Sequence, residues 1–332
     1  MASSPYPAPP GAKGVLNSNE PLPLTPQEIT PKWCTEILGR KVKTVTIAKE
    51  IHSTASKILV DLTYEGEHDT DEQPSSICVK GGFNKALVEL YPSLLWTYRR
   101  EAEFYFYTAP NINMSLPKIW HCGTDTGAKE EDFPWLAGDK EMGGNPLQAM
   151  VSSLLQPGPW EVRFKISAAP PLPESIANRE RLERAFRTMW ATENAQLRCV
   201  IHGDSHIGST FITADGRPGF IDWQGPHAGV NVQDLAYFVT GVMTVEDRRS
   251  HEVDLVKYYL QALHHNGGPR FEKDDVWHDY RKHTLHGLAW ALAAPGMQSD
   301  GNIFAMTKRH VAAVSDHETI ELLESLPEYV RG

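Results

Sequence analysis

One polar segment between a helical pattern and a β-hairpin restricts the fold of this chain more than any other feature. The segment, residues 202–209, reads His-Gly-Asp-Ser-His-Ile-Gly-Ser. Before it, residues 178–198 combine strong helix formers with an amphipathic pattern, which predicts a long helix. After it, TFIT and GFIDW flank the turn signal Ala-Asp-Gly-Arg, which predicts a hairpin over 210–223. Asp204 thus precedes the hairpin and Asp222 lies at its end.

Short strands are predicted in the first part of the chain. Runs of β-branched and aliphatic residues lie around residues 43–48, 57–64 and 76–83, and the polar stretch GEHDTDEQP separates the last two as a hairpin loop. Strand–helix–strand patterns at 117–122 and 133–142 follow. We therefore expect a five-stranded antiparallel sheet.

Two helices are predicted to accompany this sheet. Thr25 as N-cap and Pro26 as the first helical residue indicate a short helix through Leu38. After Pro92, apolar residues recur at three- and four-residue spacing and predict a helix that ends at Pro110.

Helical patterns dominate from about residue 145 onward, so the fold class is α+β. We expect a mobile Pro-rich tail over 1–25, an N-terminal lobe over 26–144 and a helical lobe with the 202–209 loop over 145–332.

Composition excludes several classes of function. The formal net charge of −10 in 332 residues disfavours a nucleic-acid partner, which would need a basic face. The four cysteines form no CxxC pair, which disfavours a zinc site or a disulfide framework. No secretory signal and no apolar run long enough for a bilayer is visible, so we expect a cytoplasmic protein without a membrane partner. Nothing in the sequence indicates the oligomeric state.

The His-Gly-Asp tripeptide and the hairpin that ends in Ile-Asp-Trp resemble the catalytic loop and the metal-binding segment of the aminoglycoside-phosphotransferase and choline-kinase-like family. The motifs E-x-x-F-Y, FIDWQ and DLAY are most similar to its ecdysteroid-kinase-like branch, and the resemblance extends over about residues 25–325. It implies a two-lobed protein-kinase-like fold with ATP between the lobes and a small-molecule alcohol as acceptor.

The resemblance also implies roles for individual residues. Asp204 corresponds to the catalytic base and Asp222 to the Mg²⁺-binding aspartate. Lys80, on a predicted strand, corresponds to the lysine that contacts the phosphates. Glu101 corresponds to the glutamate that holds this lysine, and it is favoured over Glu103 because it shares the apolar side of its helix.

Further positions are assigned by the same comparison. Glu141 and Met142 fall where the family has the hinge that contacts adenine. Asp234 matches an aspartate that braces the catalytic loop, a structural role. Ser209 stands where the family has a metal-binding Asn, and its hydroxyl is the predicted second Mg²⁺ ligand. The expected phosphate-covering loop, residues 51–57, contains no glycine.

Two other interpretations stay open. Because a serine replaces the metal-binding Asn, the chain could be a non-phosphorylating protein of the same fold, either a nucleotide-binding regulator or a protein whose cleft serves other chemistry. A pure interaction protein is the second alternative, although the retention of Asp204, Asp222 and Lys80 together argues against it.

Overall fold

A computed structural model describes most of the chain, in the ranges 21–52, 55–66, 73–90, 94–124, 146–165, 172–293 and 298–329. The chain divides into two compact units. The first comprises residues 1–131 and 210–226, and the second comprises residues 132–209 and 227–332. The predicted hairpin is therefore grouped with the N-terminal part of the chain. Residues 1–20 and the predicted lobe boundary at 144/145 lie outside the described residues.

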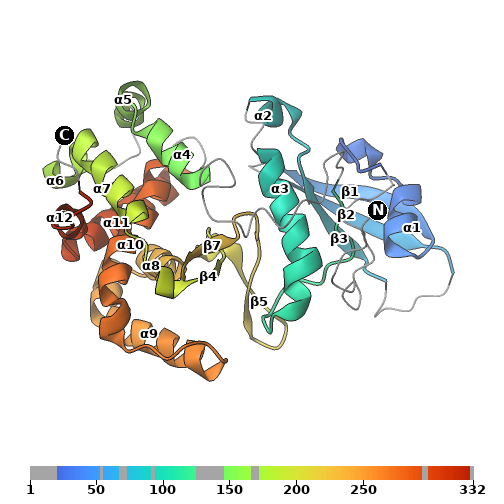
Figure 1. Ribbon diagram of the computed structural model, residues 1–332. Helices are drawn as coiled ribbons and strands as arrows, with labels where there is room; N and C mark the ends of the chain where they lie inside the picture. The colour runs from blue at the N-terminus through green and yellow to red at the C-terminus, as the bar shows by residue number, and fades with distance from the viewer. Residues whose placement is uncertain are drawn as a thin grey trace. The chain divides into compact units, whose positions relative to one another are not determined.

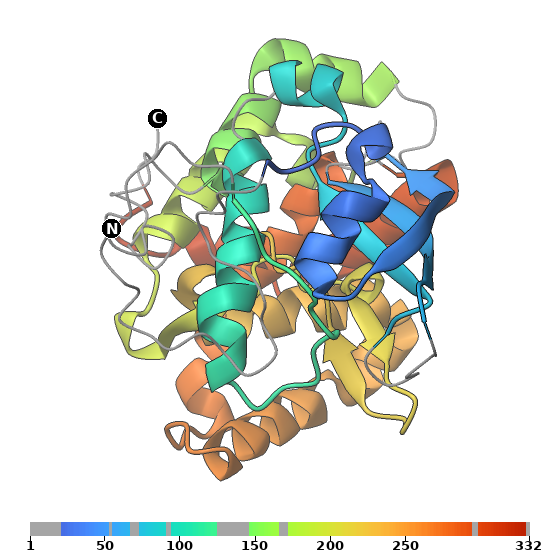
Figure 2. The same ribbon diagram turned by 90° about the vertical axis from the view of Figure 1, so that its right-hand side faces the viewer.

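The first unit contains an antiparallel sheet in the order β1–β2–β3 (Figure 1). Its strands are β1 (Val42–Ile51), β2 (Ser56–Tyr64) and β3 (Ser76–Gly81). Alternate residues of β2 are buried, as the period of a strand with one covered face requires. The helix α1 (Pro31–Leu38) covers this face, and its apolar side chains form one core with those of the sheet (Figure 2).

Within the described residues, the sheet has three of the five predicted strands. The three strands that form it match the three predicted runs, but residues 117–122 form no strand, and residues 133–142 lie outside the described part. Pro117 lacks an N–H group for a sheet ladder. The preceding Ser115 lies against the hairpin instead, because a Cβ added to Gly219 would come within 2.4 Å of the Ser115 carbonyl oxygen.

The first helix begins later than predicted. Residues Pro26–Glu28 form only a short 3₁₀ turn (η1), and the Thr25 side chain caps nothing. The α-helix starts at Pro31, where the Thr30 hydroxyl accepts a hydrogen bond from the backbone N–H of Trp33. The same signal, a threonine followed by a proline, thus occurs twice in seven residues, and the second occurrence is the one that begins the helix.

Two helices follow the sheet in the first unit, α2 (Lys85–Leu90) and α3 (Leu94–Glu103). A single π-helical turn, η2 (Phe104–Thr108), continues α3, and a 3₁₀ turn, η3 (Ala109–Asn111), ends it. The hairpin strands β5 (Thr210–Ile212) and β6 (Pro218–Phe220) pair antiparallel, which confirms the predicted hairpin.

The second unit is mainly helical. Its helices are α4 (Pro146–Leu154), α5 (Pro157–Lys165), α6 (Glu174–Ala177), α7 (Arg179–Ala191), α8 (Asn231–Val242), α9 (Val245–His265), α10 (Lys273–Ala293), α11 (Asp300–Asp316) and α12 (Thr319–Glu324). The 3₁₀ turn η4 (Ala195–Leu197) leads to the strand β4 (Arg198–Ile201), which pairs with β7 (His227–Val230).

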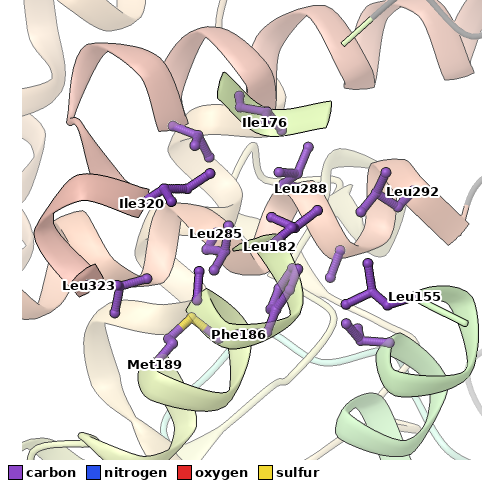
Figure 3. Close-up of a cluster of buried hydrophobic side chains, with 14 of the residues drawn as sticks. Leu155, Ile176, Leu182, Phe186, Met189, Leu285, Leu288, Leu292, Ile320 and Leu323 are labelled. Carbon is purple, nitrogen blue, oxygen red and sulfur yellow. The ribbon is translucent and has the colours of Figure 1, made fainter. Parts of the chain in front are cut away.

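One of the two hydrophobic clusters among the described residues of the second unit forms where α7 meets α10. Leu182, Phe186 and Met189 of α7 point toward Leu285 and Leu288 of α10, and α4 and α12 close the sides of the cluster (Figure 3). Burial of a large apolar side chain stabilises a fold by about 1.5–3 kcal/mol. In the described part of the chain, no helix is both long and apolar enough to cross a bilayer.

The helix predicted over 178–198 is shorter than expected. It begins as predicted, with the Asn178 side chain as its cap, but it ends at Ala191. The Lys282 ammonium donates to the Thr192 carbonyl oxygen at 2.7 Å and so caps the helix end. Of the remaining residues predicted to be helical, 195–197 form the turn η4 and Arg198 begins β4, whose pairing with β7 is a tertiary interaction that no local pattern reports. The small antiparallel sheets in the N-terminal part and the helices in the C-terminal part confirm the predicted α+β class.

Candidate active site

A cluster of ionised side chains lies on one face of the sheet in the first unit. The Lys80 ammonium on β3 lies 2.8 Å from Oε1 of Glu101 on α3 and 2.6 Å from Oδ1 of Asp222. Both carboxylates and the lysine are largely buried. The structure thus brings together three of the predicted site residues from segments that are 21 and 142 positions apart in the sequence.

The neighbouring carboxylate does not compete for this lysine. Glu103 accepts a hydrogen bond from the Arg99 guanidinium, one helical turn earlier on α3, at 2.5 Å. Of the two glutamates weighed from the sequence, Glu101 is therefore the one that contacts Lys80.

Asp222 has a second cationic partner that the sequence analysis missed. The Lys57 ammonium on β2 lies 3.1 Å from Oδ2 of Asp222, so each carboxylate oxygen contacts one lysine. Lys57 is the direct cross-strand partner of Lys80. The alignment of the two predicted strands could have suggested this pair, but their register was unknown before the structure.

The electrostatics of the cluster keep Asp222 ionised. Burial acts to raise the pKa of Asp222, but Lys80 and Lys57 outweigh it and hold this pKa below its usual value. Burial likewise acts to lower the pKa of Lys80, and Glu101 and Asp222 reverse that effect. Burial raises the pKa of Glu101 in spite of its contact with Lys80. An ionised, partly exposed carboxylate is the type of ligand that Mg²⁺ prefers.

The backbone at Asp222 is held in an unusual conformation. Its φ of 62° lies in the left-handed region, which costs a residue with a side chain about 1–2 kcal/mol. The next residue anchors the segment, because the Trp223 ring stacks on Phe104 of η2 with 4.0 Å between ring centroids. A strained backbone conformation is kept only where the contacts around the residue hold it in place, and such residues are frequent at functional sites.

The predicted catalytic loop, residues 202–209, belongs to the second unit, and Asp234 of α8 holds it. The Asp234 carboxylate accepts hydrogen bonds from the backbone N–H groups of His202 and Gly203, at 2.6 and 3.0 Å. The Ser205 hydroxyl donates to the Asp234 backbone oxygen at 2.9 Å. Gly203 adopts a φ of 79°, which a side chain would disfavour. The predicted brace is confirmed.

Within this loop, His206 links Asp204 to Ser209. The His206 Nδ1 atom accepts a hydrogen bond from the Gly208 N–H at 3.0 Å, so in the neutral ring the proton lies on Nε2. The Nε2 atom lies 3.2 Å from the Ser209 hydroxyl and 3.8 Å from Oδ1 of Asp204. The Asp204 side chain is partly exposed, whereas Ser209 is fully buried.

The remaining predicted positions are not described. Glu141 and Met142, the predicted hinge, lie outside the described residues. Within the ranges that the structure describes, no three His, Cys, Asp or Glu side chains come together as a metal cluster. The roles of Asp204, Lys80, Glu101, Asp222 and Ser209 in catalysis and binding stay predictions.

Of the comparisons with known proteins, one found a match. A search of curated proteins found no match. The model of the ecdysteroid kinase-like family matches residues 174–267, which include the 202–209 loop, the hairpin with Asp222, and Asp234. This match confirms the resemblance to the ecdysteroid-kinase-like branch and is consistent with the broader aminoglycoside-phosphotransferase and choline-kinase-like family. Over these residues, the chain is similar to the ecdysteroid kinase-like family, a kinase-like family.

Proposed function

We propose that this protein is an ATP- and Mg²⁺-dependent phosphotransferase that acts on a hydroxyl group of a small molecule in the cytoplasm. The observation that best supports the proposal is the position of Lys80 between Glu101 and Asp222. Phosphoryl transfer needs a fixed cation for the phosphates and an ionised metal ligand beside it, and this cluster offers both.

Each residue has a role in the proposal. Lys80 binds the phosphates and Glu101 orients its ammonium group, while Asp222 is the carboxylate ligand of the metal. Mg²⁺ supplies neutralisation of phosphate charge when it is bound. Asp204 accepts a hydrogen bond from the acceptor hydroxyl and orients it for attack. The brace from Asp234 fixes the loop that carries Asp204 before any substrate arrives.

A second candidate is a non-phosphorylating protein of the same fold that binds nucleotide as a regulator. Ser209 favours it, because the hydroxyl predicted to bind Mg²⁺ is fully buried and contacts His206 instead. If Ser209 is a metal ligand, the second lone pair of its buried hydroxyl oxygen must become accessible to the metal.

Two substitutions separate the proposed roles. Asp204→Asn should lower phosphate transfer by roughly a thousand-fold and leave the dissociation constant of Mg²⁺–ATP nearly unchanged, because Asp204 acts on the acceptor. Lys80→Ala should weaken nucleotide binding itself by about ten-fold or more, because it removes a charged contact to the phosphates. Calorimetric titration with Mg²⁺ and a non-hydrolysable ATP analogue measures binding. Transfer of labelled γ-phosphate from ATP to a panel of small alcohols measures turnover.

The outcomes distinguish the candidates. Nucleotide binding that depends on Lys80, without transfer to any alcohol and with ATP hydrolysis at background, would favour the regulator. Absence of nucleotide binding by the wild-type protein would refute both candidates. Ser209→Asn, which restores the amide oxygen of the family pattern, should preserve or improve turnover if position 209 binds metal.

A further inference from the structure

Lys57 is the starting point, because nothing in the proposed function uses it. It lies on β2 directly opposite Lys80 of β3, so the two side chains project from the same face of the sheet. Like charges in directly opposed positions destabilise a strand pair. The shared contact with Asp222, at 3.1 Å from Lys57 and 2.6 Å from Lys80, offsets that repulsion.

The two lysines differ in how firmly they are held. Lys80 also contacts Glu101, whereas the ion pair of Lys57 within the described residues is the one with Asp222. The Lys57 side chain is also the more exposed of the two, at 30% against 18%. Loss of the Asp222 contact would therefore leave Lys80 paired and release Lys57.

A divalent cation would cause that loss. The four charges of Lys57, Lys80, Asp222 and Glu101 cancel, so the cluster has no excess negative charge to attract a metal. A metal that binds Asp222 must displace an ammonium group from it. The displaced ammonium then needs an anionic partner, and a polyphosphate provides one in the same step.

We propose that Lys57 exchanges partners, holding Asp222 in the free protein and binding the nucleotide phosphates once the metal has taken the carboxylate. The inference rests on the proposed function, since it concerns the same site. Lys57 opposes binding of the metal alone and supports binding of the nucleotide. Through Lys57 each ligand increases the affinity for the other, as linkage requires.

The proposal predicts effects of opposite sign from one substitution. Lys57→Gln should weaken binding of an ATP analogue in the presence of Mg²⁺ by about ten-fold, the effect of one lost charge-assisted hydrogen bond. The same variant should bind Mn²⁺ alone, without nucleotide, about three-fold or more tightly, because one competing cation is gone. Calorimetric titrations of the full chain with Mn²⁺ alone and with Mg²⁺ plus adenylyl imidodiphosphate measure both quantities.

Two further variants control the experiment. Lys41→Gln removes one positive charge from the same unit, at an exposed pair with Glu65, and should change neither titration. Lys57→Arg keeps the charge and should retain most of the wild-type behaviour in both titrations. The thermal midpoint of each variant shows whether it is folded.

The results separate this inference from the proposed function. If the wild-type protein binds the nucleotide and Lys57→Gln leaves both affinities unchanged, or weakens both, the inference is wrong and the proposed function stands. If Lys41→Gln reproduces the two shifts, a general charge effect replaces the partner exchange. If the wild-type protein binds no nucleotide, both are refuted.

Discussion

One buried cluster of the first unit is neutralised by ion pairing, whereas two buried histidines of the second unit are kept neutral by burial. In the first unit, Lys80 and Lys57 form ion pairs with Asp222 and Glu101, and the four charges offset one another. In the second unit, burial lowers the pKa of His283 to about 4 and of His310 to about 3, so both imidazoles are neutral. The ion pairs of the first unit change when a ligand binds one of the paired groups. The neutral imidazoles of the second unit change when the pH falls far enough to protonate them.

The two candidate loops also differ in backbone strain. Each has a residue with a left-handed backbone at or next to an aspartate that is predicted to belong to the site. The second unit uses glycine, since Gly203 has a φ of 79° next to Asp204. The first unit uses Asp222 itself, with a φ of 62°. The 202–209 loop thus adopts its turn without strain, whereas the hairpin end has a strained residue whose carboxylate pairs with Lys57 and Lys80.

The largest expected effect comes from acid. Below pH 6.5, the unfolded chain protonates His283 and His310, while the folded second unit keeps them neutral until the pH approaches their lowered pKa values. Stability is therefore present above pH 6.5 and is lost as the pH falls, by about 1.4 kcal/mol per pH unit for each histidine. Amide hydrogen exchange at pH 7 and at about pH 5 should show α10 and α11 losing protection before β1–β3.

A substitution tests the cause of this pH dependence. Neither ring nitrogen of His283 has a hydrogen-bond partner among the described residues, so His283→Leu should remove its share of the slope. The same change at the exposed His265, at the end of α9, should leave the slope unaltered. Equal loss of amide protection in the two units would show that the buried histidines do not make the second unit the more sensitive to acid.

A smaller effect is expected at the brace of the loop. Asp234→Ala should lower the free energy of unfolding by about 3 kcal/mol, because the backbone N–H groups of His202 and Gly203 both lose their acceptor. Urea-induced unfolding measures the change. Asp300→Ala, at the exposed first turn of α11, serves as a control with an expected effect within about 0.5 kcal/mol. A loss at position 234 as small as that of the control would mean that the loop is not held by this carboxylate.

The smallest effect concerns the strained residue. Asp222→Gly and Asp222→Ala both remove the carboxylate and its two ion pairs, but only glycine adopts a φ of 62° without strain. The glycine variant should therefore be the more stable by about 1 kcal/mol. Thermal or urea unfolding of the two variants under the same conditions gives the difference directly. The reverse order would show that the left-handed backbone costs nothing here.

Local patterns predicted much of the fold. The aliphatic run of β2, the turn signal at 214–217 and the amphipathic pattern of α7 each depend on residues close in the sequence, and the structure has a strand, a hairpin and a helix in these places. The local sequence pattern gave the wrong end of a helix where a contact with a distant residue determined that end. The Lys282 side chain caps α7 at its early end, and the predicted last turns of the helix are replaced by the 3₁₀ turn η4 and the start of β4.

The candidate site divides in the same way. The sequence by itself determined which residues could do the chemistry, because Lys80, Glu101, Asp204 and Asp222 occur in motifs whose residue types phosphoryl transfer requires. Only the tertiary structure decided that Lys57 shares Asp222 with Lys80 and that Ser209 is buried against His206. The physical reason is that the charge a side chain meets depends on strand register and on packing between distant segments, and a linear pattern contains neither.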